Sequence, residues 1–225
     1  MNKKISLKVL FEDNHLLAVE KPAGILSQPD ASGEKDIAGY CKDYLKEKYA
    51  KPGNVYLGNL HRLDRNVSGV MLFARTSKAA ARMAEQFRER TVTKIYHALV
   101  EGSFREKEGR LKHKMGKDES RRRAVQGAED GMDAELEYRV LENRKLKNGR
   151  PGALLEIRLV TGRFHQIRYQ LSESGHPIVG DSKYGSSLPL ASLALRCASL
   201  GFNHPISKER MTVTGPDPDG WPAKT

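Results

Sequence analysis

The chain has 225 residues, 38% of them hydrophobic and 30% charged, which suffices for one large domain or two small ones around a proper core. Its 39 lysines and arginines exceed its 28 aspartates and glutamates, and the net charge of +11 favours a polyanionic partner, with nucleic acid first. No apolar run approaches the roughly 18 residues that a membrane span requires, and residues 1–11 lack the pattern of a signal peptide, so we expect no membrane partner.

The N-terminal part of the chain predicts a strand pair followed by a helix. Residues 6–24 contain two short apolar stretches, which indicate two strands joined by a turn at residues 12–14. Residues 37–50 carry apolar side chains at helical spacing. We therefore expect a hairpin to precede the first helix.

The middle of the chain predicts a strand, a helix and another strand. The compact apolar run at residues 69–75 is typical of a buried strand, and a second helix follows for which Ser77 is a suitable N-cap. Residues 93–102 alternate in character. This alternation predicts a strand with Lys94 and Tyr96 on the same face.

The segment 104–123 differs from its neighbours because most of its residues are charged, with basic residues in excess. It predicts either an inserted hairpin or a mobile arm, and a merely solvated loop is an equal alternative. The remaining pattern predicts strands at 134–142, 153–162, 193–202 and 209–215, and a short helix within 162–175 that ends at Gly175.

Strands outnumber helices and run in consecutive groups, which predicts an α+β fold with a mixed, mainly antiparallel sheet. No linker or internal repeat interrupts the pattern. We therefore expect one catalytic domain over residues 1–225, in two halves of approximately 1–95 and 96–225.

Several common chemistries lack their sequence patterns. The chain has no Gly-rich loop of either usual phosphate-binding spacing and no G-x-S-x-G motif, and its histidines do not show the paired spacing of a zinc protease. Cys41 and Cys197 lie far apart and match no disulfide or metal-site spacing. Such cysteine usage fits a reducing compartment, so the cytoplasm is the expected location.

The stretch H-R-L-D-R-N-V-S-G at residues 61–69 places Asp64 between Arg62 and Arg65. Read alone, it is most simply a surface loop with local ion pairs. The alternative is a carboxylate kept ionised for attack on an electrophilic carbon.

Glycosidases also use a carboxylate at an anomeric carbon, but hydrolysis needs a second carboxyl group, and nothing in the local sequence singles out Glu101, Glu135 or Asp181. A reaction that breaks a glycosidic bond and re-forms one at the same sugar needs no water. A single carboxylate could then suffice.

Six blocks occur in an order that resembles the RluA-type family of RNA pseudouridine synthases, from about residue 7 to residue 213. A lone H-R-L-D motif is weak evidence, whereas ordered blocks are strong evidence. The blocks are EKPAG (20–24), HRLDRNVSG (61–69), KIYHA (94–98), GRFHQIR (162–168), GHPIVGDSKYG (175–185) and LRCASLGFNHP (195–205).

The resemblance implies a pseudouridine-synthase-like domain whose two halves, flanked by helices, surround a central cleft. It implies isomerisation of uridine to pseudouridine in RNA without cofactor or metal, with Asp64 as the catalytic carboxylate that attacks or stabilises the ribose C1′. Tyr96 would stack on the target base and help to remove the proton from C5. Arg168 would pair with Asp64, with Ile167 and Leu171 behind it.

An RNA substrate implies that further residues around this centre bind the RNA. Because a stacked base must be flipped out before it can react, Arg62 is expected to fill the vacated stack or to bind a neighbouring phosphate. The full set of expected RNA-binding residues is His61, Arg62, Arg65, Lys94, Arg121, Arg122, Arg123, Arg163 and His165.

The expected partner is a structured stem-loop of ribosomal or transfer RNA, bound by a monomer. Many members of the family carry an N-terminal RNA-binding domain of the S4 type, and the strand-like start at Ser6 predicts that this chain does not. The family commonly has Thr at the position of Val67 and His at the positions of Gln170 and Arg196. A non-catalytic RNA-binding protein with the same fold is the alternative function.

Overall fold

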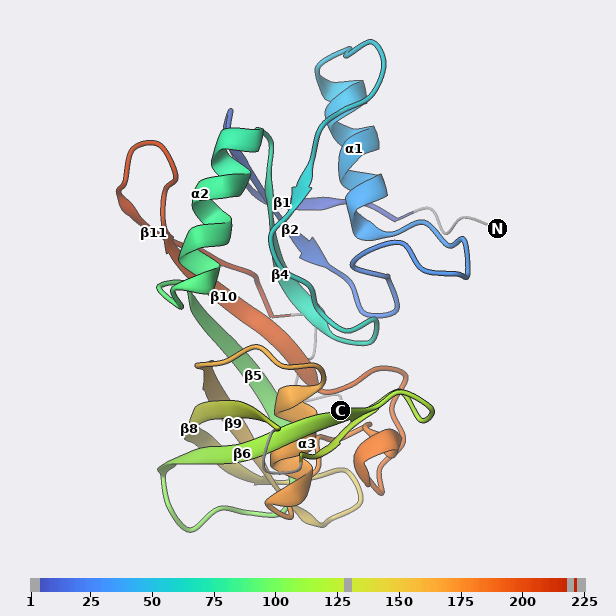
Figure 1. Cartoon of the computed structure of the whole chain (residues 1–225). Coiled ribbons are helices and arrows are strands. Elements are labelled where there is room, and N and C mark those ends of the chain that lie inside the picture. The colour runs from blue at the N-terminus through green and yellow to red at the C-terminus, as the bar shows by residue number, and fades with distance from the viewer. Residues whose placement is uncertain (1–4, 128–130, 218–220, 222–225) are drawn as a thin grey trace. The chain divides into compact units, whose positions relative to one another are not determined.

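The computed structural model describes residues 5–127, 131–217 and 221, and the chain divides into two compact units (Figure 1). Unit 1 contains Met1–Val92 and Cys197–Gly215, and unit 2 contains Thr93–Arg196 and Pro216–Thr225. The first boundary is close to the division near residue 95 that the sequence suggests. The structure also assigns Cys197–Gly215 to unit 1, and the sequence pattern does not predict this assignment.

Unit 1 is built on a sheet in which β1, β2, β4 and β10 are neighbours in that order, with β3 beside β4 and β11 beside β10. The pairs β1–β2, β2–β4, β3–β4 and β10–β11 are antiparallel. Nearly all side chains of β2 and β4 are buried, so these two strands form the centre of the core. The strands are β1 (Lys8–Glu12), β2 (Leu16–Lys21), β3 (Gly58–Asn59), β4 (Ser68–Ala74), β10 (Leu195–Asn203) and β11 (Arg210–Thr214).

Two capped helices belong to unit 1, α1 (Ile37–Lys48) and α2 (Ser77–Arg88). The Asp36 side chain caps α1 by accepting from the amide of Gly39. The cap of α2 is Thr76, not Ser77 as the sequence suggested. Thr76 keeps an extended backbone while its hydroxyl accepts from Ala79 N at 3.2 Å, and Ser77 is the first helical residue.

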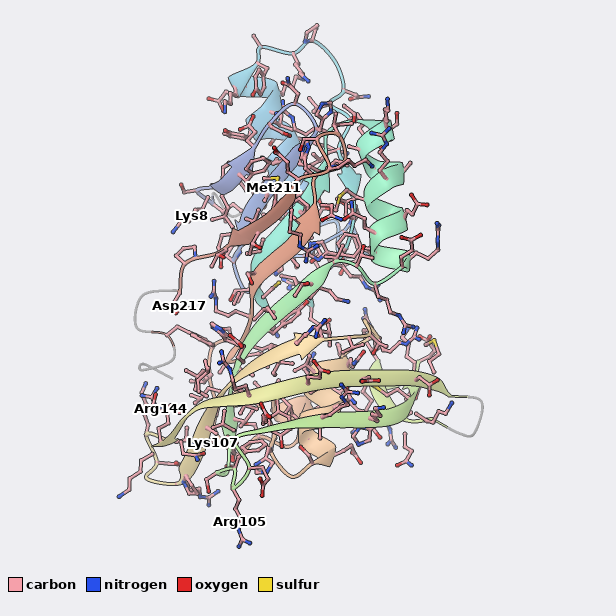
Figure 2. All side chains as sticks on the ribbon, turned by 90° about the vertical axis from the view of Figure 1, so that its left-hand side faces the viewer. Lys8, Arg105, Lys107, Arg144, Met211 and Asp217 are labelled. Carbon is pink, nitrogen blue, oxygen red and sulfur yellow. The ribbon has the colours of Figure 1, made fainter. Side chains whose placement is uncertain are left out.

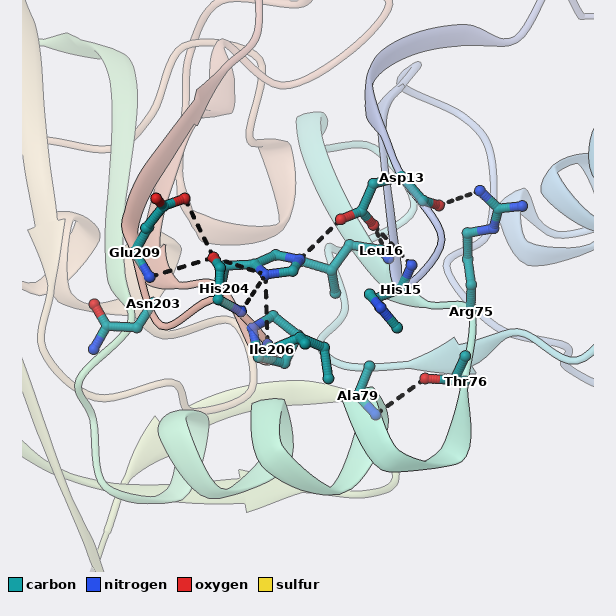
Figure 3. A network of polar contacts seen from close by, with 12 residues as sticks. Asp13, His15, Leu16, Arg75, Thr76, Ala79, Asn203, His204, Ile206 and Glu209 are labelled. Atoms are coloured by element: carbon teal, nitrogen blue, oxygen red, sulfur yellow. Dashed lines mark hydrogen bonds and ion pairs between the residues drawn. The ribbon is translucent and has the colours of Figure 1, made fainter.

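A polar network joins the β1–β2 turn to the loop between β10 and β11 (Figure 3). One oxygen of Asp13 accepts from the amides of His15 and Leu16, and the other contacts His204 Nε2 at 2.9 Å. His204 Nδ1 accepts from Ser207 N at 3.0 Å, so His204 donates from Nε2 to Asp13. The network therefore ties the C-terminal hairpin of unit 1 to its N-terminal one.

Unit 2 is built on an antiparallel sheet in the order β5-β9-β8-β6-β7, and α3 packs against β6, β7 and η1. The strands in both units confirm the predicted α+β fold with a mainly antiparallel sheet. The elements are β5 (Thr93–Glu101), β6 (Glu108–Asp118), β7 (Arg123–Gln126), β8 (Met132–Lys145), β9 (Pro151–Leu159), α3 (Gln166–Glu173) and the 3₁₀ helix η1 (Ser182–Tyr184).

The charged segment 104–123 is ordered as strand β6 and the turn into β7, so the hairpin reading of the sequence is confirmed. Arg105, Lys107 and Arg144 mark the end of the sheet at which β6 begins beside β8 (Figure 2). Within the described part of the chain, no helix is both long and apolar enough to span a membrane.

Candidate functional site

The loop between β3 and β4 carries Asp64, and its backbone is fixed on both sides of that residue. The Ser27 hydroxyl donates to Leu63 O at 2.6 Å and accepts from Leu63 N at 3.0 Å. Val67 N donates to Asp64 O at 3.0 Å, which closes a turn directly after the carboxylate. Asp64 itself is half-buried, so a rigid backbone presents a partly accessible carboxylate.

Lys21, the last residue of β2, is fully buried beside this loop. Its Nζ donates to the carbonyls of Pro22, Ile25 and Arg65 at 3.0, 2.7 and 3.0 Å. Burial lowers the pKa of Lys21 to about 7, while the negative charge of Asp64 raises it and the positive charge of Arg65 lowers it further. Lys21 is therefore a support of the loop that also interacts electrostatically with Asp64.

The residues that flank Asp64 take different positions. Arg62 is exposed. The Arg65 guanidinium contacts Glu34 at 2.6 Å and donates to Gly24 O at 3.1 Å. His61 Nε2 accepts from Leu72 N at 3.0 Å, so its contacts favour a role in holding the loop on β4.

Strand β5 carries Lys94 and Tyr96 as predicted, two residues apart on one face. Tyr96 is 7% exposed, and Lys94 Nζ lies near Gly162, the first residue of the block that leads into α3. The pairing of β5 with β9 fixes Tyr96 opposite Ile157. The aromatic ring is thus supplied by a strand of the unit 2 sheet rather than by a loop.

Arg168 lies in the first turn of α3 and is buried. Its Nε and Nη2 donate to the two carboxylate oxygens of Asp181 at 2.7 and 2.8 Å. The guanidinium also lies over the ring of Tyr184, with 4.9 Å to the ring centroid, and its Nη1 is 3.0 Å from His165 Nε2. The predicted catalytic arginine is therefore held in place by contacts with Asp181, His165 and Tyr184, all within unit 2.

The three predicted catalytic residues belong to different units, Asp64 to unit 1 and Tyr96 and Arg168 to unit 2. The pairing of Asp64 with Arg168 stays a prediction. Among the described residues, no group of His, Cys, Asp and Glu side chains is arranged to hold a metal ion.

The predicted RNA-binding arginines of unit 2 are not equivalent. Arg121 and Arg122 are exposed in the turn between β6 and β7, and Arg121 contacts Asp118 at 3.7 Å. Arg123 is half-buried and lies over Tyr184, with 5.5 Å to the ring centroid. Arg163 Nε donates to Asp133 O at 3.0 Å. Of this group, Arg121 and Arg122 present the most accessible charge.

The departures from the family pattern have local explanations. Val67 is buried. The fully buried Gln170 amide donates to Leu111 O at 3.0 Å and accepts from Gln166 Nε2 at 2.9 Å, which joins α3 to β6. Arg196 is buried, contacts Asp217 at 2.7 Å and donates to Pro216 O at 2.6 Å. Gln170 and Arg196 thus have polar partners within unit 2, and Val67 is buried in the core.

Lys21, Asp181 and Tyr184 contact the candidate site and were not assigned from the sequence. Lys21 lies in the block EKPAG, and the other two lie in the block GHPIVGDSKYG. The blocks were therefore the available signal, but Lys21 contacts Arg65, 44 positions away, Asp181 contacts Arg168, 13 positions away, and Tyr184 contacts Ala124, 60 positions away.

The chain matches the family model described as RNA pseudouridylate synthase over residues 15–173. It is 35% identical to "Uncharacterized RNA pseudouridine synthase YhcT" of Bacillus subtilis over 217 residues, which are 94% of this chain and 69% of that protein. It is 33% identical to "Dual-specificity RNA pseudouridine synthase RluA" of Vibrio vulnificus over 204 residues, which are 89% of this chain and 79% of that protein.

A solved structure shows the same fold. "Human RNA Pseudouridylate Synthase Domain Containing 1" matches with a TM-score of 0.76 and 26% sequence identity, covering 97% of this chain and 87% of that one. The chain therefore belongs to the RNA pseudouridylate synthase family and, within it, to the RluA type.

Proposed function

We propose that this protein isomerises uridine to pseudouridine within RNA and that Asp64 is the catalytic carboxylate. The observation that carries the proposal is the family match over residues 15–173, which includes Asp64, Tyr96 and Arg168. The rigid loop around Asp64 and the buried Lys21 beside it support the assignment, because a reacting carboxylate must be held in place.

The reaction conserves all atoms of the nucleotide. The Asp64 carboxylate attacks C1′, or stabilises the positive charge that develops there, as the bond from C1′ to N1 breaks. The uracil then rotates and forms a new bond from C5 to C1′; where Asp64 has attacked C1′, the bond between the carboxylate and C1′ breaks in this step. The proton leaves C5 and a proton is bound at N1, so neither water nor a cofactor is consumed.

Tyr96 and Arg168 have complementary roles in this proposal. The Tyr96 ring stacks on the uracil, which holds the base without fixing its orientation within the ring plane. Tyr96 also assists removal of the C5 proton. Arg168 pairs with Asp64 and keeps the carboxylate directed at the sugar.

The proposed substrate is a stem-loop of ribosomal or transfer RNA that a monomer binds in the cytoplasm. Arg62 is exposed near Asp64 in sequence and takes the place of the flipped base or binds a neighbouring phosphate. Arg121 and Arg122 bind the RNA backbone. The two buried cysteines are compatible with a reducing compartment.

The test is tritium release from RNA labelled at uridine C5, with bulk transfer and ribosomal RNA that lack modification as substrates. We expect release by the native protein and a loss of at least about 10³-fold for Asp64→Asn. The matched control is Asp43→Asn, which removes one exposed carboxylate on α1 and should keep full activity.

Other outcomes would each contradict the proposal. Unchanged release by Asp64→Asn would remove Asp64 from the chemistry. No release by native protein that binds RNA would favour the non-catalytic binding protein. Free uracil as the product would indicate a glycosidase-like hydrolase.

A further inference from the structure

Phe164 is a half-buried aromatic side chain of unit 2 that lies two residues before helix α3. The imidazole ring of His165 stacks on it, with 3.8 Å between the ring centroids and 19° between the ring planes. An imidazole at this distance covers one face of the phenyl ring. Any further partner of Phe164 must therefore use the other face or the edge of the ring.

His165 is itself fixed by residues of the candidate site. Its Nε2 is 3.0 Å from Arg168 Nη1, and its Nδ1 is 2.9 Å from the hydroxyl of Tyr184. The His165 and Tyr184 rings also meet edge to face, with 5.6 Å between their centroids. The Phe164 ring thus rests on a rigid support, and only one side chain separates it from the predicted catalytic arginine.

The other face of the Phe164 ring is covered by a cation that is free to move. Lys117 Nζ lies 5.2 Å from the ring centroid, and the stacked imidazole leaves no room for it on the first face. Lys117 also contacts Glu119 at 2.7 Å, and these two side chains are 43% and 76% exposed. Both contacts are weak at an exposed site, so an RNA phosphate can draw the ammonium away from the ring.

The turn that follows Lys117 and the nearby η1 carry more cations than carboxylates. Lys183 Nζ donates to Arg122 O at 3.2 Å, which links η1 to this turn. An aromatic ring beside excess positive charge is typical of sites that bind single-stranded nucleic acid. The cations are Lys117, Arg121, Arg122 and Lys183, and the carboxylates are Asp118 and Glu119.

The start of strand β5 lies close to the segment that carries Phe164. Lys94 Nζ is 3.7 Å from the position that a Cβ would take on Gly162. Lys94 is two residues before Tyr96, and Gly162 is two residues before Phe164. A nucleotide bound at Phe164 would therefore be a near neighbour of the base that Tyr96 is proposed to hold.

We propose that Phe164 stacks on an unpaired base next to the target uridine, and that Lys117 moves from the ring to a phosphate of the same RNA. Phe164 is then a specificity-determining residue, because the identity of the stacked base affects how well the RNA binds. The inference rests on the proposed function, in which Tyr96 stacks on the target uracil.

The first test uses Phe164→Trp as a fluorescent reporter, with Phe104→Trp as the matched control. Phe104 is also half-buried and stacks on a histidine, His176, with 4.0 Å between centroids. It follows the far end of the nine-residue strand β5, about 26 Å from the start of that strand. The single native tryptophan, Trp221, is common to both variants, so its signal is subtracted.

We expect unmodified ribosomal RNA to quench at least about half of the fluorescence that Phe164→Trp adds, because a stacked base contacts the indole directly. The fluorescence that Phe104→Trp adds should stay unchanged. Absence of quenching in Phe164→Trp, or equal quenching in both variants, would overturn the proposal.

The second test measures the Kd of the same RNA at about 200 mM salt, where phosphate contacts contribute less to binding. Phe164→Leu keeps an apolar side chain but removes the ring, and we expect its Kd to rise about 5- to 100-fold. Phe164→Tyr should restore the native Kd, and Phe104→Leu should change it less than about twofold. An unchanged Kd in Phe164→Leu, or an equal rise in Phe104→Leu, would contradict base stacking at Phe164.

Lys117→Gln tests the second part of the proposal. It should lower the slope of log Kd against log salt concentration by about 0.7, the value for one phosphate contact of a single strand. An unchanged slope would show that Lys117 does not bind a phosphate.

These measurements separate the inference from the proposed function. If the native protein released no tritium, the proposed function would fail, and quenching in Phe164→Trp would still establish a stacked base. Normal tritium release without quenching would overturn the inference alone.

Discussion

At the residue scale, Lys21 makes the folding stability depend on pH. Burial lowers its pKa from 10.5 to about 7 in the folded protein, so between these values the unfolded chain binds more protons than the folded one. The free energy of unfolding should therefore rise with pH in this window, by at most about 1.4 kcal/mol per pH unit from this residue. Urea unfolding at intervals from about pH 7 to 10 measures the slope.

The matched variant is Lys21→Met, which nearly keeps the length of the side chain and removes the titrating group. Its stability should lack this contribution, so the difference between native and variant slopes isolates Lys21 from the other groups that titrate in the same range. Identical slopes for the two proteins would show that Lys21 keeps an ordinary pKa in the folded state.

The sequence assigned some candidate site residues and left others unassigned, for a physical reason. Asp64, Tyr96 and Arg168 were assigned because they lie within ordered blocks that resemble a family. Asp181 was only one of several carboxylates, because its pairing with Arg168 depends on how α3 and the following turn pack. The lowered pKa of Lys21 likewise depends on burial, which the residues around it in sequence do not reveal.

At the element scale, strand β4 needs glycine where it begins, directly after the Asp64 loop. Gly69 has a φ of +119°, and a Cβ at this position would lie 2.2 Å from Cys197 O of β10. We expect Gly69→Ala to lower the free energy of unfolding by about 2–4 kcal/mol, because it combines backbone strain with an overlap that only movement of β10 can relieve. Denaturant unfolding followed by circular dichroism measures the loss.

Gly149→Ala is the control for strain alone. Gly149 has a φ of +79° in the turn before β9, and a Cβ at this position would have no atom within 4 Å. This variant should lose about 1 kcal/mol. A loss at Gly69 no larger than the loss at Gly149 would show that β4 and β10 can separate without cost.

Most elements were predictable because their patterns are local. The alternation in β5 and the buried runs in β2 and β4 correspond to real strands. The segment 104–123 was ambiguous because β6 alternates between exposed charge and half-buried side chains, which lacks the apolar signal of a core strand. Helix α3 begins later than the start of its block, because His165 has a left-handed backbone, with φ at 51°, before the first helical residue.

At the scale of the whole molecule, the net charge of +11 overstates the charge that the β6–β8 face presents. Strand β8 places acidic side chains opposite the basic ones of β6. Arg110 contacts Glu135 at 3.0 Å and also Glu137, and Lys114 contacts Asp133 at 2.9 Å. This face is a ladder of opposite charges, so the basic excess that can attract RNA must be concentrated elsewhere, including the turn at Arg121 and Arg122.

The salt dependence of RNA binding distinguishes the turn at Arg121 and Arg122 from the β6–β8 face. Arg122 is exposed and has no carboxylate in ion-pair contact among the described residues, so it is suited to bind a phosphate. Arg122→Gln should reduce the slope of log Kd against log salt concentration by about 0.7–0.9, the value for one phosphate contact. Arg110→Gln removes the same charge from the ladder and should leave the slope nearly unchanged. Fluorescence anisotropy with a labelled RNA stem-loop measures both, and equal changes would show that the ladder also binds RNA.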